Sequence, residues 1–250
     1  MRQPGNEARQ NPFPQPAKML PTPNTDHIDP LTTYEPAEDS YLVLDTLQTQ
    51  RAFLAARFPA GTPPPLVLEL GTGSGIISAF VGAHAAALFG RADVVQLGTD
   101  ANALACAATA ATLRVAGAHA RFLGALHADL CAPLRARVAD VLLFNPPYVP
   151  TEAVPALVAA AGASAHDEES RLLALTYAGG ADGMEVTRRV FAQLDGVLSA
   201  RGVAYVLLTA ANRPAAVADE LRAEGWTCEQ VGASGRRGGI EKLSIWRIWK

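Results

Sequence analysis

The stretch Leu66-Val67-Leu68-Glu69-Leu70-Gly71-Thr72-Gly73-Ser74-Gly75 leads from a short, largely apolar run into a loop with a glycine at every second position. The run, residues 66–70, has the length and composition of a buried strand. Small and apolar residues follow from about 74 to 88 and predict a helix. Glycines between a strand and a helix allow a sharp turn and let the backbone approach a ligand closely. This stretch therefore predicts the first strand–loop–helix unit of an α/β fold.

Strands and helices alternate along the rest of the chain. Further strands are predicted at residues 94–98, 121–126, 138–144 and 203–209, and helices at residues 37–58, 101–115, 186–198 and 214–224. The segments 226–231 and 243–249 flank a glycine-rich stretch and predict a terminal hairpin. Because alternating strands and helices form a parallel sheet covered on both faces, the expected class is α/β. The expected sheet is seven-stranded and mostly parallel, with the hairpin adding an antiparallel strand.

The chain is long enough for one sizeable domain, which we place at residues 34–250. Hydrophobic residues make up 49% of the chain and charged residues 18%, so most of it is expected to fold. Residues 1–33 contain seven prolines and no apolar periodicity, which predicts a partly disordered segment or an extended arm laid over the fold. Residues 151–176 are longer than a simple connection needs. This insertion is either a lid or a tolerated surface loop, and the sequence favours neither.

Composition argues against several classes of function. The formal net charge is −3, which gives no broad positive surface for nucleic acid. The three cysteines are far apart and the five histidines lack ligand spacing, so we expect neither a disulfide framework nor a metal site. No apolar run is long enough to cross a membrane, and the N-terminus lacks the apolar core of a signal peptide. We therefore expect a soluble protein of the cytoplasm, with the nucleus as a second compartment, that contacts neither membranes nor nucleic acid directly.

A second informative stretch, Asn145-Pro146-Pro147-Tyr148, follows the predicted strand 138–144. Two prolines cannot continue a sheet ladder or the interior of a helix, so the chain must turn there. In an open α/β sheet, ligands bind at this carboxyl end of the strands. The asparagine oxygen and a proline carbonyl can accept the two hydrogens of a planar NH2 group, and the tyrosine ring can pack on its face. Taken alone, the stretch also fits an ordinary strand-end turn.

Acidic residues occur at the ends of three predicted strands in turn. Glu69 lies just before the glycines, Asp100 follows the second strand, and Asp129 follows the third. A buried acid beside the glycines suits a cationic ligand group, directly or through water. Asp100 can accept from both hydroxyls of a ribose, and Asp129, with Leu130 beside it, can accept from the exocyclic amine of an adenine. Alternatives stay open: local backbone bonds for Glu69, a helix N-cap for Asp100 and a loop cap for Asp129.

The glycine spacing separates two families of nucleotide-binding loop. Gly71, Gly73 and Gly75 alternate, whereas dinucleotide-binding enzymes use Gly-x-Gly-x-x-Gly. A sulfonium nucleoside has no pyrophosphate to bind, but it carries a cationic amino-acid end. The pattern therefore favours a sulfonium nucleoside and makes a dehydrogenase the weakest alternative.

Taken together, the glycine loop, the three acids and the Asn-Pro-Pro-Tyr stretch resemble the class I S-adenosylmethionine-dependent methyltransferases that methylate amino groups. The stretch Tyr34-Glu35-Pro36-Ala37-Glu38-Asp39-Ser40 is more specific. It resembles the signature of the eukaryotic and archaeal HemK-like glutamine methyltransferases, which act on class I translation release factors. Residues 178–183, Ala-Gly-Gly-Ala-Asp-Gly, also fit that family, and residues 19–23, Met-Leu-Pro-Thr-Pro, resemble its usual beginning in fungi. The resemblance covers about residues 19–250 and leaves the insertion without a role.

The resemblance implies an enzyme with a class I (Rossmann-like) fold and S-adenosyl-L-methionine as its cofactor. The implied reaction is methyl transfer to the side-chain amide N5 of the glutamine in the Gly-Gly-Gln motif of eukaryotic release factor 1. Carried over by position, the cofactor contacts are Ser40, Glu69, Gly71, Gly73, Asp100, Ala101, Asp129, Leu130 and Asn145. The clamp for the substrate amide is Asn145, Pro146, Pro147 and Tyr148.

The resemblance also implies protein partners. Eukaryotic members of the family form heterodimers with a small zinc-binding activator, which adds a strand to the sheet edge formed by the third strand. The short and weakly apolar third strand, residues 121–126, agrees with this expectation. The substrate is the release factor, either alone or bound to its GTPase partner with GTP.

Other functions remain as alternatives. A DNA or RNA adenine N6-methyltransferase shares the clamp, but it needs an extruded base and a basic groove, against which the net charge of −3 argues. Protein lysine methylation is a second alternative. A non-catalytic scaffold that retains the fold is a third, and the intact acids and clamp speak against it.

Overall fold

The computed structural model describes residues 19–159, 161–235 and 242–250. Residues 1–18 of the predicted N-terminal arm and most of the glycine-rich turn of the predicted hairpin lie outside these ranges. Within these ranges, no helix has the length and apolar character needed to cross a bilayer.

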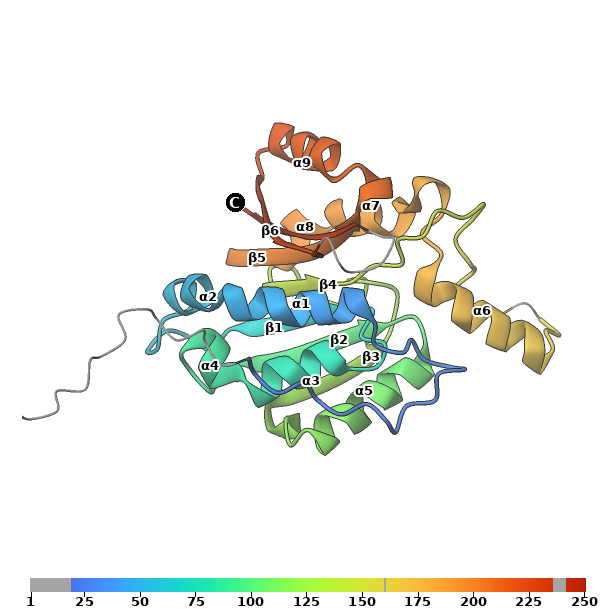
Figure 1. Cartoon of the computed structure of the whole chain (residues 1–250), viewed down its shortest axis with the longest axis horizontal. Helices are drawn as coiled ribbons and strands as arrows, with labels where there is room; N and C mark the ends of the chain where they lie inside the picture. The colour runs from blue at the N-terminus through green and yellow to red at the C-terminus, as the bar shows by residue number, and fades with distance from the viewer. Residues whose placement is uncertain (1–18, 160, 236–241) are drawn as a thin grey trace, which may run out of the picture.

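The strands of the described chain form one seven-stranded sheet in the order β3-β2-β1-β4-β5-β7-β6 (Figure 1). They are β1 (Leu66–Leu70), β2 (Val95–Asp100), β3 (Phe122–His127), β4 (Ala139–Phe144), β5 (Leu198–Thr209), β6 (Thr227–Ala233) and β7 (Leu243–Trp249). β1 to β5 run parallel, and β7 is antiparallel to both β5 and β6. The predicted α/β class, the mostly parallel sheet and the closing antiparallel hairpin are confirmed.

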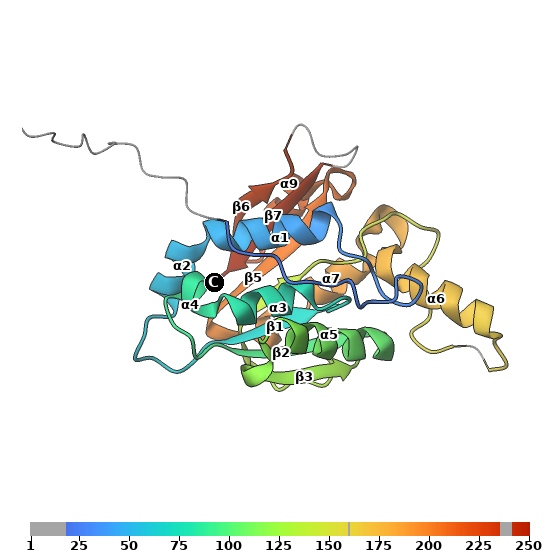
Figure 2. The ribbon, with the colours of Figure 1, turned by 60° about the horizontal axis from the view of Figure 1, so that its bottom comes forward.

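Helices cover both faces of the sheet (Figures 1 and 2). On one face lie α1 (Glu38–Thr49), α2 (Arg51–Arg57), α3 (Ile76–Ala83), α4 (Ala85–Phe89) and α5 (Ala103–Val115). On the other face lie α7 (Glu185–Phe191), α8 (Leu194–Val197) and α9 (Pro214–Ala223). Short 3-10 turns occur at His119–Arg121, Ala181–Gly183 and Ala210–Asn212.

Alternate residues of the central strands point into two separate cores, as the pleat of a strand requires. From β4, Val141 and Leu143 pack with α1 and α3, whereas Leu142 and Phe144 pack with α7 and α9. All six residues of β4 are buried. Burial on both faces explains why near-continuous apolar runs, rather than alternating ones, predicted these strands.

Three predicted helices are each divided in two. The helix predicted at 37–58 breaks at Gln50, the one at 74–88 breaks at His84, and the one at 186–198 breaks at Ala192. Neither glycine nor proline stands at any of these breaks, and the apolar pattern continues across them. Sequence periodicity therefore predicts the helical segments but not their interruptions.

The insertion contains a helix, α6 (Ala165–Tyr177), which projects from the body of the molecule (Figure 1). Its first turn is closed by a capping box. The Ser164 hydroxyl accepts from the Asp167 N–H at 3.2 Å, and the Asp167 carboxylate accepts from the Ser164 N–H at 3.0 Å. The Ser-x-x-Asp spacing is the sequence signal for this helix, which the apolar pattern alone does not reveal.

Residues 19–33 run over the face formed by α1, α3 and α5 (Figure 2). The Leu20 N–H donates to Gln48 Oε1 of α1 at 2.7 Å, and Asn102 Nδ2 donates to the Thr32 carbonyl at 2.7 Å. These bonds lead the chain to Tyr34, at the carboxyl end of the sheet.

The sheet grows in opposite directions from β1. β2 and β3 lie on one side of β1, whereas β4 and β5 lie on the other. The loops after β1 and β4 therefore diverge and leave a crevice outside the carboxyl ends of the strands, which is where open α/β sheets bind ligands. The glycine loop and Asn145 both occupy this position.

Candidate active site

A cavity lies at the carboxyl ends of β1, β2 and β4 and encloses ≈ 1110 Å³, counting the part open to solvent. Among the described residues, all those predicted for the site line it except Tyr148. The residues that do so are Ser40, Glu69, Gly71, Gly73, Asp100, Ala101, Asp129, Leu130, Asn145, Pro146 and Pro147. The fold therefore brings together residues that the sequence places on separate segments.

The N–H groups of the glycine loop are used within the chain. The Gly71 N–H donates to the Thr99 carbonyl, and the Gly73 N–H donates to Asp100 Oδ2, both at 2.8 Å. A dinucleotide site needs such N–H groups directed at the pyrophosphate. The geometry therefore favours a nucleoside without phosphates and argues against the dehydrogenase alternative.

Asp100, at the end of β2, has one backbone bond at each carboxylate oxygen. Oδ2 accepts from Gly73 and Oδ1 accepts from the Asn102 N–H, both at 2.8 Å. The N-cap of α5 is Asn102, whose side chain accepts from the Leu104 N–H at 2.9 Å, so the capping alternative for Asp100 is wrong. Burial raises the pKa of Asp100, and the two N–H bonds oppose that rise. Each oxygen keeps a lone pair, which is what binding two ribose hydroxyls requires.

Glu69 is buried inside β1, with 3% of its surface exposed. Its Oε2 accepts a hydrogen bond from the Ser78 hydroxyl of α3. Burial raises the pKa of Glu69 to about 8, and the bonds from Ser78 offset only part of this rise. A buried carboxylate needs charge compensation to ionise, so the position suits a cationic ligand group.

Asp129 follows β3 and forms an ion pair with Arg189 of α7. Arg189 also lines the cavity. Sequence reasoning missed Arg189, because nothing in its helix distinguishes it from a surface arginine. Arg189 bonds Oδ2 of Asp129, which leaves the lone pairs of Oδ1 open to a ligand donor.

Asn145 directly follows β4, and its amide is only half satisfied. Nδ2 donates to Asp39 Oδ2 at 2.9 Å, whereas Oδ1 is buried and finds no hydrogen-bond partner among the described residues. Leaving a buried acceptor unpaired costs about 1–3 kcal/mol. Such an atom at a cavity wall is a candidate acceptor for a ligand N–H. Sequence reasoning did not identify Asp39, although it stands next to Ser40 in the signature.

Two glycines of residues 178–183, Gly179 and Gly183, pack directly against the Asn-Pro-Pro-Tyr turn. The Gly179 N–H donates to the Val149 carbonyl at 2.9 Å. A Cβ at Gly179 would lie 2.6 Å from the Pro147 carbonyl oxygen, and one at Gly183 would lie 2.1 Å from that of Tyr148. No side chain fits at either position, so packing against the turn explains the first and last glycines of the Gly-Gly-x-x-Gly segment, whereas Gly180, with φ of +76°, faces the Glu185 side chain.

Tyr148 lies apart from the other clamp residues. It lines a second hollow together with Val149, Pro150, Lys242 and residues 209–211 at the end of β5. It also packs against the core formed by α1 and α3. The structure therefore brings Asn145 and the two prolines to the cavity and places Tyr148 beside it.

The insertion supplies one wall of the cavity. Leu172, Leu175 and Thr176 of α6 line it, as do Val154 and Leu157 from the segment before the helix. Sequence reasoning left the insertion without a role, because neither resemblance nor spacing ties it to the site. Its position favours the lid interpretation over that of a surface loop remote from the site.

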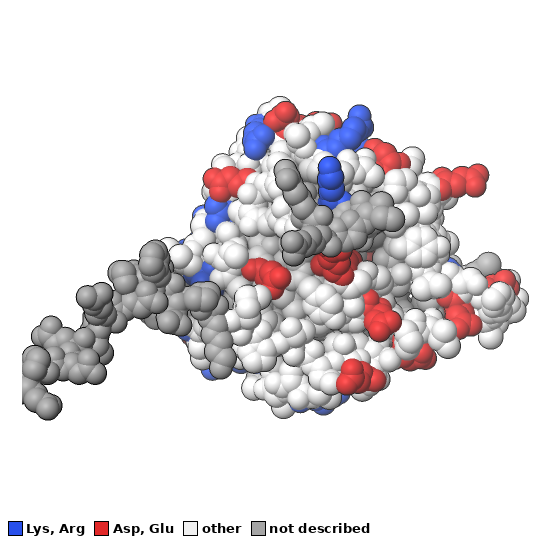
Figure 3. All heavy atoms as spheres, viewed as in Figure 1, with Lys and Arg blue, Asp and Glu red and all other residues white. Residues whose placement is uncertain are grey.

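The face drawn in Figure 3 is not predominantly basic. Acidic side chains are spread over this face, and basic ones lie mostly at its upper and left margins. This face of the described residues therefore offers no continuous basic track for a nucleic-acid backbone. In the described ranges, no three His, Cys, Asp or Glu side chains are placed to hold a metal ion.

The site fits a nucleoside with a cationic tail. Asp100 provides two acceptors for a ribose, and Glu69 provides a buried acid that a cation would favour in its ionised form. Asn145 adds an acceptor for the N–H of a second molecule. This combination suits transfer of a group from a sulfonium nucleoside to an amide or amine.

Comparisons with known proteins agree with this geometry. The chain is 34% identical to methyltransferase HEMK2 of Mus musculus over 238 residues, which cover 94% of the chain and 99% of that protein. It is 31% identical to the eRF1 methyltransferase catalytic subunit mtq2 of Schizosaccharomyces pombe over 242 residues, 93% of the chain and 96% of that subunit. A chain of the E. cuniculi Mtq2–Trm112 complex, described as responsible for the methylation of the eRF1 translation termination factor, matches with a TM-score of 0.54. The identity is 26%, over 88% of this chain and 99% of that chain. No protein-family model matches the chain.

Both relatives align with the chain over nearly their whole length. Both are named as methyltransferases, so the chain is an enzyme of that class, and its class implies the use of S-adenosylmethionine. The chain therefore belongs to the family of the methyltransferases HEMK2 and Mtq2.

Proposed function

We propose that this enzyme transfers a methyl group from S-adenosyl-L-methionine to the side-chain amide N5 of the glutamine in the Gly-Gly-Gln motif of release factor 1. The observation that carries the proposal is the buried Oδ1 of Asn145, an acceptor at the cavity wall with no partner in the described chain. A glutamine amide offers the planar NH2 group that such an acceptor suits. The fission yeast relative and the E. cuniculi complex, whose printed descriptions name eRF1, support this choice of substrate.

The cofactor would be held by residues at three strand ends. Asp100 would accept from the ribose hydroxyls, and Glu69 and Ser40 would contact the cationic amino-acid end. Asp129 would accept from the adenine amine, and Leu130 would pack on the ring. The remaining proposed contacts, Gly71, Gly73 and Ala101, line the cavity with small residues that let the cofactor approach the backbone. When bound, S-adenosyl-L-methionine supplies the methyl group on a positively charged sulfur.

The clamp acts by orienting a weak nucleophile. An amide nitrogen reacts poorly because its lone pair is delocalised into the carbonyl. Asn145 Oδ1 and the Pro146 carbonyl would accept its two hydrogens and orient the nitrogen for the reaction. Pro147, backed by Gly179, would keep the turn rigid, and Tyr148 would support the turn from outside the cavity, where it packs against the core. Orientation and electrostatics would then replace a strong base, and the proton that the nitrogen loses on methylation would leave to solvent through the open side of the cavity. Good orientation alone contributes about 7–11 kcal/mol to such reactions.

The edge strand β3 is the proposed site of a small zinc-binding activator. β3 pairs with β2 on one side, and no strand of the described chain covers the other side. Leu123 and Leu126 of β3 are 66% and 40% exposed, which is unusual for a strand of a parallel sheet. A partner that adds a strand here would pair the open backbone groups and cover these side chains. The E. cuniculi structure, a complex of Mtq2 with Trm112, supports a partner of this kind.

Mass spectrometry of the methylated product tests the proposed function. The chain is co-expressed with the zinc-binding activator and incubated with S-adenosyl-L-methionine and release factor 1, alone and with its GTP-bound GTPase partner. We expect one added methyl on the Gly-Gly-Gln glutamine and none on a release factor in which that glutamine is replaced by alanine. Methylation confined to lysine, or to adenine in an added RNA or DNA, would overturn the proposal. We place the activity in the cytoplasm, where translation ends, and in the nucleus as a second compartment.

A further inference from the structure

Residues 34–40 contain a buried acid whose role the proposed function leaves open. We propose that Asp39, supported by Tyr34, is a positioning residue that holds the Asn145 amide in the orientation that binds a substrate NH2 group. This inference rests on the proposed function and adds residues outside the Asn-Pro-Pro-Tyr motif. Asp39 is 4% exposed and lies at the cavity wall.

The Asp39 carboxylate accepts hydrogen bonds from three neighbouring residues. Oδ2 accepts from Asn145 Nδ2 at 2.9 Å, and both oxygens lie 3.0 Å from the Tyr34 hydroxyl. Oδ1 also accepts from the Ser40 N–H at 2.7 Å and from its hydroxyl at 3.4 Å. Every partner is a donor, as an ionised carboxylate requires. These bonds fix the carboxylate on the first turn of α1, facing the end of β4.

The carboxylate decides which way the Asn145 amide points. An asparagine amide can exchange the places of its oxygen and its NH2 group, and the neighbouring groups select one orientation. At 2.9 Å from Asp39 Oδ2, the NH2 group must face the carboxylate, because an amide oxygen there would meet another acceptor. Oδ1 then points elsewhere, and within the described ranges it has no partner. Asp39 thus keeps the Asn145 oxygen available for a substrate N–H.

The two interacting segments are 106 positions apart in the sequence and meet only in the fold. Ser40, the neighbour of Asp39, is a proposed cofactor contact. Adjacent residues of one helical turn would therefore serve the cofactor and the amide clamp. This arrangement gives a physical reason why residues 34–40 and the Asn-Pro-Pro-Tyr turn occur together in this chain.

Exchanging the acid and the amide between the two positions tests the inference. In D39N, the Ser40 N–H keeps an oxygen in the place of Oδ1, so the new NH2 group faces Asn145 and draws its oxygen away from the substrate. We expect the rate of methyl transfer to fall about 100-fold. N145D places two carboxylates against each other, so its rate of methyl transfer should fall further than that of D39N. In D39N/N145D, the NH2 group at position 39 donates to the new carboxylate at position 145, whose second oxygen remains for the substrate. The double variant should recover at least about tenfold over N145D.

The rates are measured in single turnover on the activator complex, with saturating S-adenosyl-L-methionine and release factor 1. Tyr34→Phe removes one donor to Asp39 and should lower the rate a few-fold. Asp45→Asn makes the same chemical change at an exposed position of α1 and should leave the rate unchanged. Affinity for S-adenosyl-L-methionine, from calorimetry, and the melting temperature of D39N should both stay close to wild type.

The outcomes separate this inference from the proposed function. A double variant no better than N145D, or a D39N that loses cofactor affinity in step with its rate, would overturn the positioning role. If the wild-type enzyme methylates the glutamine and D39N is equally active, only the positioning role is overturned. A wild-type enzyme that leaves the glutamine unmethylated defeats the proposed function, and this inference with it.

Discussion

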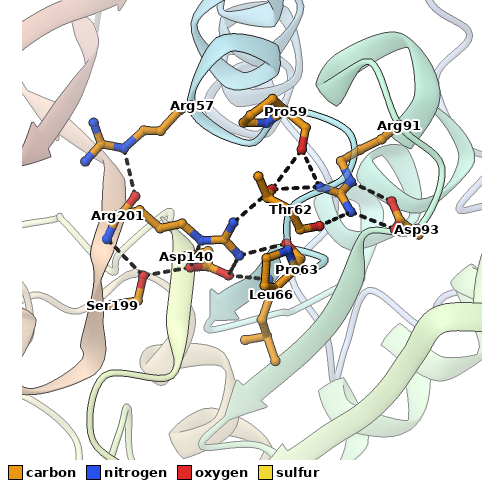
Figure 4. Close-up of polar contacts among 10 residues, drawn as sticks. All are labelled: Arg57, Pro59, Thr62, Pro63, Leu66, Arg91, Asp93, Asp140, Ser199 and Arg201. Carbon is orange, nitrogen blue, oxygen red and sulfur yellow. Dashed lines mark hydrogen bonds and ion pairs between the residues drawn. The ribbon is translucent and has the colours of Figure 1, made fainter.

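The polar side chains at the two ends of the sheet differ in how fully they are hydrogen-bonded. At the amino ends of β1, β4 and β5, charged side chains bond to one another and to the backbone (Figure 4). At the carboxyl ends, Asn145 Oδ1 is left without a partner in the described chain, and the pKa of Glu69 is raised to about 8 by burial. The same strands therefore begin in a hydrogen-bonded network of charged side chains and end beside a buried acceptor without a partner in the described chain.

Asp140 is the centre of the amino-end network. It accepts from the Leu66 N–H at 3.0 Å, from the Ser199 hydroxyl at 2.6 Å and from Arg201 at 2.9 Å through both Nε and Nη2. Arg201 also donates to the Pro63 carbonyl at 3.0 Å. The network ties the starts of three strands to the loop before β1.

The guanidinium of Arg91, near the amino end of β2, is also fully hydrogen-bonded. It bonds Asp93 through Nε and Nη2, at 2.6 and 2.7 Å, and reaches the Pro59 carbonyl and both oxygens of Thr62. The hydrogen bonds from Arg91 lower the pKa of Asp93 to about 2. The hydrogen-bonded network at the amino end and the unpaired Asn145 oxygen at the carboxyl end indicate a division of labour, in which the amino end stabilises the fold and the carboxyl end gives up stability for binding.

The largest expected effect is at the carboxyl end. Asn145→Ala removes the unpaired acceptor, so methyl transfer should fall about 1,000-fold, the range seen when one preorganised polar group is lost. Affinity for S-adenosyl-L-methionine should stay within a few-fold of wild type, because Asp100 and Glu69 remain. Single-turnover rates and calorimetry check this prediction. A collapse of cofactor binding would instead show that Asn145 mainly holds the cofactor.

At the amino end, Asp140→Ala should act on stability rather than on chemistry. It leaves Arg201, Ser199 and the Leu66 N–H without their common acceptor, and breaking a largely buried pair costs about 3 kcal/mol. Urea unfolding measures the loss, and the rate of methyl transfer at low temperature should be near wild type. Asp219→Ala is the control, because its pair with Arg222 is exposed and its loss should hardly move the midpoint. If the Asp140→Ala protein kept wild-type stability but transferred methyl groups slowly, the amino end would act on the reaction rather than on stability, contrary to this proposal.

Gly183→Ala tests how far the site depends on the close packing of Gly183 against the Asn-Pro-Pro-Tyr turn. The new methyl group would meet the Tyr148 carbonyl at 2.1 Å and push the turn, so the rate should fall about 30-fold. Gly196→Ala is the matched control, because the described residues leave open space around its Cβ position. Both variants are compared by kcat and by melting temperature. Equal, small effects on kcat would show that the turn tolerates movement.

The last expected effect is a change in how stability depends on pH. Glu69 has a folded-state pKa of about 8 against 4.5 for an ordinary glutamate, so the folded state holds its proton more tightly than the unfolded state. The resulting stabilisation is complete below about 4.5 and is lost as the pH rises toward 8. Glu69→Gln cannot lose a proton, so its unfolding free energy should fall less than that of the wild type between pH 5 and 8. Parallel urea titrations without cofactor check the difference, and identical slopes would contradict the raised pKa.

The sequence predicts the two ends of the sheet unequally. The strand at 66–70, the glycine loop and the acids at the strand ends could be predicted, because burial on both faces and turn chemistry are local properties. The turn at Asn145 could also be predicted, since two prolines leave the chain few options. The amino-end network was not predicted, because charged residues such as Arg201 and Asp140 look like solvated surface until the fold pairs them.

The missing parts of the site have the same cause. Arg189 reaches Asp129 from another helix, and Asp39 reaches Asn145 across 106 positions. No spacing rule connects such pairs, because only tertiary packing brings them together. α6 was also missed, although its capping box is visible in the sequence, since its residues lack a strong apolar stripe.

The open edge of β3 bears on how much of this enzyme a cell can hold. An exposed strand with Leu123 on its surface is a template for unwanted pairing between chains. Copies made in excess of the proposed partner would aggregate or be degraded, whereas copies that meet it would be protected. The supply of the partner would then set an upper limit on the amount of the enzyme that a cell accumulates.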